Sequence, residues 1–476
     1  MSDSRRRSAA GLLGLLFLLT LPLVTPRIFA SDEIQYYAYL RSFWFDRDVS
    51  FANEYEYFHE HGIATAYGFK EVFIERRTET GKNINFGTVG SALLWAPFYA
   101  AGDLVARASG GRFPADGYST PYVAAVCIGT AIYGLLGLML SLRCVREILR
   151  RDPDPLAGFA GAAAVWFGTP LAFYMYLSPV MAHATSAFTC ALFLLVWLRV
   201  RRSWSVGGVA LLGACAALMV MVREQDAFYL PMVAIDFTWS LLAGRTASTT
   251  AGAAHRPDGS ARARRMRMAG AAIVGSIAGL VVFVPQALAY LSLNGHVGPS
   301  RLVSRKMFWD APFAWDVLFS PEHGFFLWTP LALVALGGAV LLVLEPERRR
   351  IGLLLLTGAA SHVYVAGSLA SWSAAGAFGQ RRFVSLTPLL VIGMVVLLDR
   401  LRGWRRWAVV AVTAVCVYWN VALMFQFGAQ LMDRHRLDVP RAARVAFIEL
   451  PTQLPRLTYR FLFERSSYFA PPHPEK

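Results

Sequence analysis

The chain has 476 residues, of which 56% are hydrophobic and only 16% are charged, and its mean hydropathy is +0.44. Soluble globular domains contain about 25% charged residues, so this composition excludes a soluble protein and indicates helices that cross a bilayer. The formal net charge is +15. Because the arginines gather in short segments between apolar runs, as the positive-inside rule predicts, the charge does not point to a nucleic-acid partner.

Apolar runs of about the length that crosses a membrane follow one another along the chain. They cover residues 9–30, 85–107, 120–142, 156–176, 180–198, 205–222, 227–243, 269–291, 324–344, 351–370, 384–399 and 407–426. We therefore predict an all-α, polytopic membrane protein with about 11–13 transmembrane helices. The basic segments that mark its cytoplasmic side are residues 143–151, 199–202, 245–267, 348–350 and 400–406.

The first run, residues 9–30, follows three arginines at residues 5–7. This basic start predicts a cytoplasmic N-terminus and puts the end of the run on the outer face of the plasma membrane, which is the inner membrane of a cell envelope. A signal peptide cleaved after Ala30 is the alternative. Since Pro26 interrupts the end of the run and Ile28 is not small, we expect a helix that is retained.

Two adjacent carboxylates, Asp32 and Glu33, stand directly after this run. Charge so close to hydrocarbon costs free energy and is kept mainly where it is used. We predict that both are catalytic, with Tyr36 and Tyr37 lining the same cavity; the alternative is that both acids only face water. The first outer loop, residues 31–84, also has apolar and aromatic residues at helical spacing, which predicts interfacial helices.

Cations on the predicted outer segments are a second group of candidates. Lys82, Arg381 and Arg382 lie where the topology rule disfavours positive charge. Guanidinium groups bind phosphate bidentately, and a lysine meets it as a point charge. We predict that these three residues bind a donor phosphate, with His323 as a hydrogen-bond donor. The alternatives are contacts with lipid headgroups for the cations and a structural hydrogen bond for His323.

His183 and Arg223 lie at junctions between apolar runs and outer loops. Ionisable residues at that depth usually face a polar cavity, so both are predicted to line it. Local pairing of Arg223 with Asp226 is the alternative. The chain shows no metal-ligand spacing and no paired cysteines, so we predict no cofactor and no bound metal, although the sequence leaves a divalent metal open.

A single membrane domain is predicted over residues 1–430. Within it, residues 244–268 are rich in small residues and arginine, which predicts a flexible cytoplasmic linker. Residues 431–476 are predicted to form a short tail that packs on the outer surface.

The pattern contains one topological conflict. If the runs at 85–107 and 120–142 both cross the membrane, the basic segment 143–151 falls on the outer side, against the positive-inside rule. Either a crossing is missed in this region or one of the runs is re-entrant, and the sequence leaves both open.

Four short motifs resemble those of the type C glycosyltransferase superfamily, nearest to its protein O-mannosyltransferase and aminoarabinose-transferase branch. They are Asp32-Glu33, Gly90 to Tyr99, Ser320 to Pro330 and Gly376 to Phe383. The resemblance implies a polyprenyl-phosphate sugar donor and an acidic catalytic base in the first outer loop. Carried over, this base is Asp32, with Glu33 as its neighbour. The chain departs from the family in lacking a large soluble outer domain, which weakens the case for a peptide acceptor.

We therefore expect a sugar to move from a polyprenyl phosphate to an acceptor hydroxyl on the outer face, with inversion. Asp32 would take the proton of the attacking hydroxyl, and the cations would stabilise the departing phosphate. The alternatives are a transporter or flippase of lipid-linked sugars and a purely structural membrane protein. No internal repeat is present and the ionisable candidates gather at one face, which favours the enzyme. The sugar, the acceptor (glycan, lipid or protein) and the lipid length are left open.

Overall fold

The computed structural model describes residues 8–63, 68–243, 259–374 and 376–464. Within these residues the structure is helical and holds no β-strand beyond two isolated bridges, so the predicted all-α fold is confirmed. The long helices are α1 (Ala9–Thr20), α4 (Gly90–Ala108), α5 (Thr120–Leu149), α6 (Pro155–Gly168), α8 (His183–Val200), α9 (Val206–Val222), α10 (Leu230–Ala243), α11 (Gly259–Asn294), α15 (Leu331–Leu344), α16 (Arg349–Ser368), α17 (Thr387–Arg400) and α18 (Gly403–Gly428). The shorter ones are α2 (Ser31–Arg41), α3 (Ala52–Glu60), α7 (Leu171–Tyr176), α12 (Arg301–Ser304), α13 (Ala314–Phe319), α14 (Phe325–Trp328), α19 (Val439–Arg444) and α20 (Leu450–Phe463).

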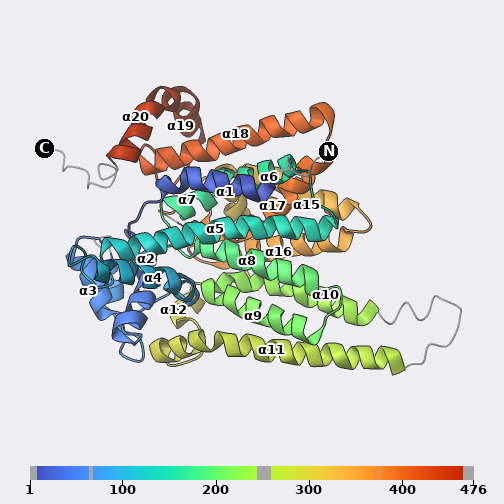
Figure 1. The fold of residues 1–476 in the computed structure, drawn as a ribbon, viewed down its shortest axis with the longest axis horizontal. Coiled ribbons are helices and arrows are strands. Elements are labelled where there is room, and N and C mark those ends of the chain that lie inside the picture. Colours follow the sequence, from blue (N-terminus) through green and yellow to red (C-terminus); the bar gives the residue numbers. More distant parts are fainter. Residues whose placement is uncertain (1–7, 64–67, 244–258, 375, 465–476) are drawn as a thin grey trace, which may run out of the picture.

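The bundle has two chemically different ends (Figure 1). One end, called the loop end below, carries α2, α3, α12 and the connection between α16 and α17. The other, called the arginine end, carries ion pairs such as Arg151 with Asp399 and Arg201 with Asp236. The basic segments 143–151, 199–202, 348–350 and 400–406 lie at this end, which is the arrangement that the positive-inside rule predicts for one side of a membrane.

The long helices run between these two ends. Among the described residues, six helices are long and apolar enough to cross a membrane, and four shorter apolar helices (α1, α6, α9 and α15) run beside them. Helix α10 also runs between the two ends. The hydroxyl of Tyr229, just before α10, donates a hydrogen bond to the Ser385 carbonyl near the loop end, and Asp236 of α10 forms an ion pair with Arg201 at the arginine end. Within the described residues, eleven segments thus run between the two ends, and how many of them cross a membrane stays a prediction.

The topological conflict is resolved by α4, which does not run from end to end. Just before α4, the Thr88 hydroxyl donates to the carbonyl of Val222, at the loop end of α9 (2.8 Å). In the connection between α4 and α5, the carbonyl of Gly117 accepts a hydrogen bond from Tyr37 of α2 (2.6 Å). Helix α4 therefore begins and ends at the loop end, and α5 brings residues 143–151 to the arginine end, as the positive-inside rule requires.

The first loop contains the helices expected there, α2 and α3, followed by a π-helical turn at Lys70–Glu75. Helix α2 is buried on most of its surface, from Glu33 to Leu40 except for Tyr36, so it packs inside the protein rather than lying free. Its contact with a membrane surface stays a prediction, as do the boundaries of the membrane domain.

The predicted linker is shorter than expected on its C-terminal side. Residues 244–258 lie outside the described residues, whereas residues 259–268 are the first turns of α11. The segment from Ala261 to Met268 alternates alanine, arginine and methionine, all strong helix formers, and Met268 is buried. Propensity and packing therefore extend the helix into a segment whose small and basic residues had suggested a linker.

The tail folds back on the bundle within the residues that the structure describes. After α18 the chain forms α19, a π-helical turn at Val445–Glu449, and α20. The Tyr418 hydroxyl of α18 donates to the Ala446 carbonyl (2.5 Å), which ties the tail to the bundle. The end of the predicted tail, residues 465–476, lies outside the described residues.

Glycine pairs set the closest helix contacts. A Cβ atom at Gly338 of α15 would lie 1.9 Å from the carbonyl oxygen of Gly393 in α17. A Cβ atom at Gly213 of α9 would lie 2.0 Å from the carbonyl oxygen of Gly275 in α11. Small residues let membrane helices approach in this way. The α15–α17 contact fixes the helix that follows Arg381.

Candidate functional site

The loop end holds an ion pair between Asp32 and Arg381. Asp32 lies in the first turn of α2, where the helix dipole favours a carboxylate. Arg381 begins the 3-10 turn Arg381–Leu386 that leads into α17. Its Nη2 atom lies 2.8 Å from Asp32 Oδ2, and the Asp32 and Arg381 side chains are 39% and 22% exposed. The structure thus brings together the predicted base and a predicted phosphate ligand, both within reach of a ligand.

Glu33 is buried and holds the start of α2. Its Oε2 atom accepts the backbone N–H groups of Phe29 (2.9 Å) and Ala30 (3.1 Å), and its Oε1 atom accepts the Ser178 hydroxyl (2.5 Å). Burial raises the pKa of Glu33 to about 7, while these hydrogen bonds and the charge of Arg27 act to lower it. Both carboxylate oxygens are engaged, so Glu33 fixes the position of its neighbour Asp32 instead of facing a substrate.

Two further arginines lie near Arg381. Arg382 is only 8% exposed and donates to the Trp372 carbonyl (3.2 Å). Arg223 follows α9, and its Nη1 atom is buried without a hydrogen-bond partner among the described residues. The charges of all three arginines act on the buried imidazole of His183, at the start of α8. Three cations from two separate segments are therefore close to one side chain.

Tyr36 lies beside the ion pair. Tyr36 is partly buried, and loss of water around its hydroxyl raises the pKa of Tyr36 to about 12, while the charges of Arg223, Asp32 and Arg381 also act on it. The predicted cavity residues Tyr36, His183 and Arg223 are thus near the Asp32–Arg381 pair. We use the name arginine cluster for six residues near Asp32: Tyr36, Tyr174, His183, Arg223, Arg381 and Arg382.

Tyr174 of α7 is a member that sequence reasoning missed. Its ring packs on His183 with the centroids 4.3 Å apart, and its hydroxyl donates to the Phe378 carbonyl (3.2 Å), three residues before Arg381. The charge of Arg381 acts on this hydroxyl. Tyr174 stands inside an apolar run, where an aromatic residue is ordinarily part of the core, so no sequence signal could have found it.

Two acids follow Arg223. Glu224 accepts a hydrogen bond from Tyr290 of α11, and Asp226 accepts one from the Ser186 hydroxyl (2.6 Å). Burial raises the pKa of both acids, that of Asp226 to about 6. Within the described ranges Arg223 and Asp226 form no direct ion pair, but the charge of Arg223 acts to lower the pKa of Asp226, so local pairing of the two residues stays an alternative.

Lys82 and Tyr37 are placed in structural contacts. Lys82 Nζ donates to Ser292 Oγ near the end of α11 (2.5 Å), and the buried Tyr37 donates to Gly117. In the part of the chain that the structure describes, neither forms a hydrogen bond or ion pair with Asp32 or with the arginine cluster. The structure therefore does not bring these two predicted residues to the site.

His323 is also placed in the fold. It is fully buried, stacks on Trp328 with ring centroids 4.7 Å apart, and donates from Nε2 to the Ala377 carbonyl (2.8 Å). Burial lowers the pKa of His323 to about 4, so its imidazole is neutral near pH 7 and offers no charge to a phosphate. Its contacts instead hold the connection that leads to Arg381.

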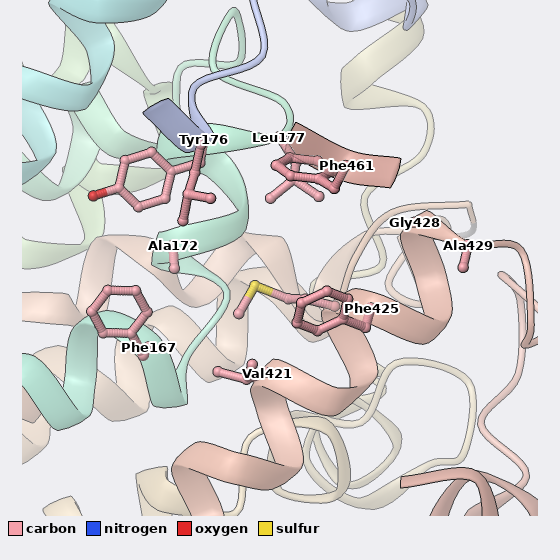
Figure 2. Close-up of a pocket in the computed structure, with 11 residues that line it drawn as sticks. Phe167, Ala172, Tyr176, Leu177, Val421, Phe425, Gly428, Ala429 and Phe461 are labelled. Carbon is pink, nitrogen blue, oxygen red and sulfur yellow. The ribbon is translucent and has the colours of Figure 1, made fainter. Parts of the chain in front are cut away.

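An apolar cavity of about 180 Å³ lies on the other side of α7 (Figure 2). Ala172 and Tyr176 line it and are four residues apart, so they share one face of α7, whereas Tyr174 lies on the opposite face. The rest of the lining comes from Leu23, Phe167, Leu177, Val421, Met424, Phe425, Gly428, Ala429 and Phe461. Helix α7 thus separates this cavity from the arginine cluster.

Among the described residues, no group of three or more His, Cys, Asp or Glu side chains is placed to hold a metal ion. The five cysteines are free and buried. The expectation that no cofactor or metal is needed stays a prediction.

No protein-family model and no curated protein sequence matches the chain. Among solved structures, the chain is similar to ArnT from Cupriavidus metallidurans bound to undecaprenyl phosphate, with a TM-score of 0.52, 15% identity, and coverage of 97% of this chain and 74% of that chain. The apo structure of the same protein gives a TM-score of 0.49, also at 15% identity. At this identity the likeness concerns the fold. The superfamily that the motifs resemble and its mannosyltransferase-like branch both stay predictions.

Proposed function

We propose that the protein is an integral-membrane glycosyltransferase that moves a sugar from a polyprenyl-phosphate donor to an acceptor hydroxyl, on the outer face of the plasma membrane. The observation that carries this proposal is the Asp32–Arg381 pair, a partly exposed carboxylate and guanidinium joined from distant segments at one end of the bundle. The fold resembles that of a protein solved with undecaprenyl phosphate, which supports a lipid phosphate as the donor.

The arginine cluster is the proposed site of the donor phosphate. Arg381 and Arg382 lie with Arg223, whose Nη1 atom is buried without a partner among the described residues. A buried, unpaired N–H is costly, and a phosphate oxygen would satisfy it with a charge-assisted hydrogen bond. Positive charge at this position also stabilises the negative charge that grows on the phosphate as it leaves.

Asp32 is the proposed general base. The acceptor oxygen attacks the anomeric carbon, the bond from that carbon to the phosphate oxygen breaks, and Asp32 takes the hydroxyl proton. Attack from the face opposite the phosphate inverts the anomeric carbon. A positioned base typically contributes about 10²–10⁴-fold to the rate, and fixing the donor headgroup at a membrane surface supplies proximity.

The apolar cavity beyond α7 is the proposed place for part of the prenyl chain. Its lining is aliphatic and aromatic, and it adjoins the helix that carries Tyr174 into the arginine cluster.

The position of the charged residues along the bundle also bears on the transporter alternative. The charged candidates gather at the loop end, whereas transport sites lie near the middle of the bilayer, so the placement favours a transferase.

Substitution of Asp32 tests the proposal directly. Full-length protein in proteoliposomes is given a panel of polyprenyl-phosphate sugars and a crude membrane lipid extract as acceptor, and release of polyprenyl phosphate is measured. Asp32→Asn is expected to lower the rate by about 10²–10⁴-fold, because the amide cannot take the proton. Expression should stay close to wild type, since Asp32 is partly exposed, and the donor should bind at least as tightly, because Arg381 no longer pairs with a carboxylate.

Asp46→Asn is the matched control. Asp46 also lies in the first loop and also pairs with an arginine, Arg41, and its side chain is 28% exposed. It should keep near-normal turnover. Full turnover by Asp32→Asn, or an equal loss in both variants, would overturn the assignment of Asp32 as the base.

A further inference from the structure

A polar pocket, separate from the apolar cavity beside α7, lies at the loop end. It is formed between the turn at residues 76–84 and the connection that follows α11. Its volume is about 190 Å³, which is several times the roughly 30 Å³ that one water occupies in the liquid. Four arginines line it, Arg76, Arg77, Arg301 and Arg305, against one acid, Glu79, so the lining carries three excess positive charges.

The walls of the pocket are joined by hydrogen bonds between the two segments. Thr80 Oγ1 donates to the Leu293 carbonyl (2.9 Å), and Arg301 pairs with Glu79 (2.8 Å). Arg77 is held by Asn83. The pocket is therefore built without help from Arg76 and Arg305.

Arg76 and Arg305 carry the charge that is not neutralised. Both are exposed, and within the described residues neither forms a hydrogen bond or an ion pair through its side chain. Two unpaired guanidinium groups on facing walls offer several N–H donors to one tetrahedral anion. Arginine suits phosphate better than lysine here because its planar group binds two oxygens at once.

Helix α11 links this pocket to the arginine cluster. The hydroxyl of Tyr290 in α11 donates a hydrogen bond to Glu224, which follows Arg223 in the chain. Asn294, four residues after Tyr290 in the same helix, lines the pocket. Four residues of α-helix rise by about 6 Å. The pocket thus lies about one helical turn along α11 from the contact with the arginine cluster, at the end of a membrane-spanning bundle where lipid headgroups are found.

We propose that this pocket binds the phosphate headgroup of a membrane lipid, as a second anion site separate from the arginine cluster. Four arginines around one volume at the membrane end provide the charge and the geometry for a phosphate. The inference does not rest on the proposed transfer reaction, because it concerns binding alone. Salt weakens such exposed pairing, so binding should decrease as ionic strength rises.

Binding of phosphatidic acid to purified full-length protein, measured by native mass spectrometry and by titration in detergent, tests this inference. The double variant Arg76→Ala/Arg305→Ala is expected to bind phosphatidic acid roughly tenfold more weakly or worse, because two charge-assisted contacts are lost. The matched control is Arg112→Ala/Arg436→Ala, which removes two exposed arginines from the same end of the bundle. The control should bind like the wild type.

A competition arm identifies the group that is recognised. If inorganic phosphate displaces phosphatidic acid, the phosphate group alone suffices; if it does not, while the double variant still fails to bind, the site requires a phosphate presented by a lipid. Both results support the pocket. Equal binding by wild type and the double variant, or an equal loss in the control, overturns it.

The transfer assay and the binding assay keep the two proposals apart. Asp46→Asn, which lies outside both the pocket lining and the arginine cluster, should bind phosphatidic acid like the wild type. A pocket variant that loses lipid binding supports the inference whatever happens to transfer, whereas the transfer rate of Asp32→Asn bears only on the proposed function.

Discussion

At the scale of single residues, two neighbouring carboxylates have opposite surroundings. Asp32 is partly exposed and pairs with Arg381, while Glu33 is fully buried and caps α2. Consecutive residues of a helix point about 100° apart, so adjacent acids reach different neighbours. The sequence predicts that the pair lies where the first apolar run ends. It does not predict which acid is buried, because that depends on Ser178, 145 residues away.

The raised pKa of Glu33 predicts a pH dependence of stability. The pKa rises from 4.5 to about 7 on folding, so the folded protein holds a proton that the unfolded chain releases. This contribution is fully present below pH 4.5 and is lost as the pH rises through 7. Relative to Glu33→Gln, the wild type should lose about 3 kcal/mol of unfolding free energy between these values, as an order of magnitude.

The measurement is the unfolding free energy of both proteins in mixed micelles from pH 4.5 to 7.5. Glu56→Gln, on the exposed face of α3, is the control for replacing an acid by an amide. A difference between wild type and Glu33→Gln that stays constant across this range would contradict the prediction.

Arg381 should act mainly on the donor. Arg381→Lys keeps the charge but loses the fork that binds two oxygens, so KM for the polyprenyl-phosphate sugar should rise roughly 10- to 100-fold. Arg400→Lys is the matched control, because Arg400 ends the same helix at the arginine end and pairs with Glu345. An unchanged KM in Arg381→Lys would remove Arg381 from the phosphate site.

Sequence reasoning predicted part of the candidate site for a definable reason. Asp32, Arg223 and Arg381 were predicted because charge beside an apolar run is unusual. The same reasoning also selected Lys82 and His323, which the structure places in other contacts. Depth in the membrane can be read from a sequence, but the neighbours at that depth depend on how the helices pack.

At the scale of elements, the α15–α17 contact supports the turn that carries Arg381. Gly338→Ala would place a Cβ atom 1.9 Å from the Gly393 carbonyl oxygen, so the helices must separate. We expect a loss of about 1–3 kcal/mol. The thermal unfolding temperature in detergent should fall, and transfer activity should fall with it.

Gly337→Ala is a close control for this prediction. Gly337 precedes Gly338 in α15, but a Cβ atom there would meet nothing within 4 Å. Alanine is also the better helix former, so this variant should be as stable as the wild type or slightly more so. Equal destabilisation by both variants would show that the contact does not matter.

The elements show where sequence periodicity is informative. The apolar runs predicted the helices of the bundle, because each run is long enough to be unambiguous. Helix α4 is long enough to cross but is not among the helices that are apolar enough to do so, and it stays at the loop end, where Tyr37 and Thr88 fix its two sides. Only the basic segment 143–151 gave a sign of this, through the conflict with the positive-inside rule.

At the scale of the whole molecule, the placement of both ends of α4 at the loop end predicts a topology that labelling can test. All five native cysteines are buried, so single introduced cysteines should react selectively with an impermeant maleimide. Glu60→Cys and Arg112→Cys lie on either side of α4 and should label from the same face of intact cells. Glu347→Cys, at the arginine end, should label only after the membrane is opened. Labelling of residues 60 and 112 from opposite faces would show that α4 crosses.

The ion pair of Asp32 with Arg381 has a kinetic consequence for the proposed reaction. One guanidinium cannot hold the carboxylate and a phosphate with the same N–H groups, so an arriving donor competes with Asp32 for Arg381. The base is then released only in the presence of the group that it will help to transfer. Under the proposed mechanism the donor therefore binds before the acceptor, because the carboxylate of Asp32 becomes free to take a proton only after the phosphate has taken its place beside Arg381.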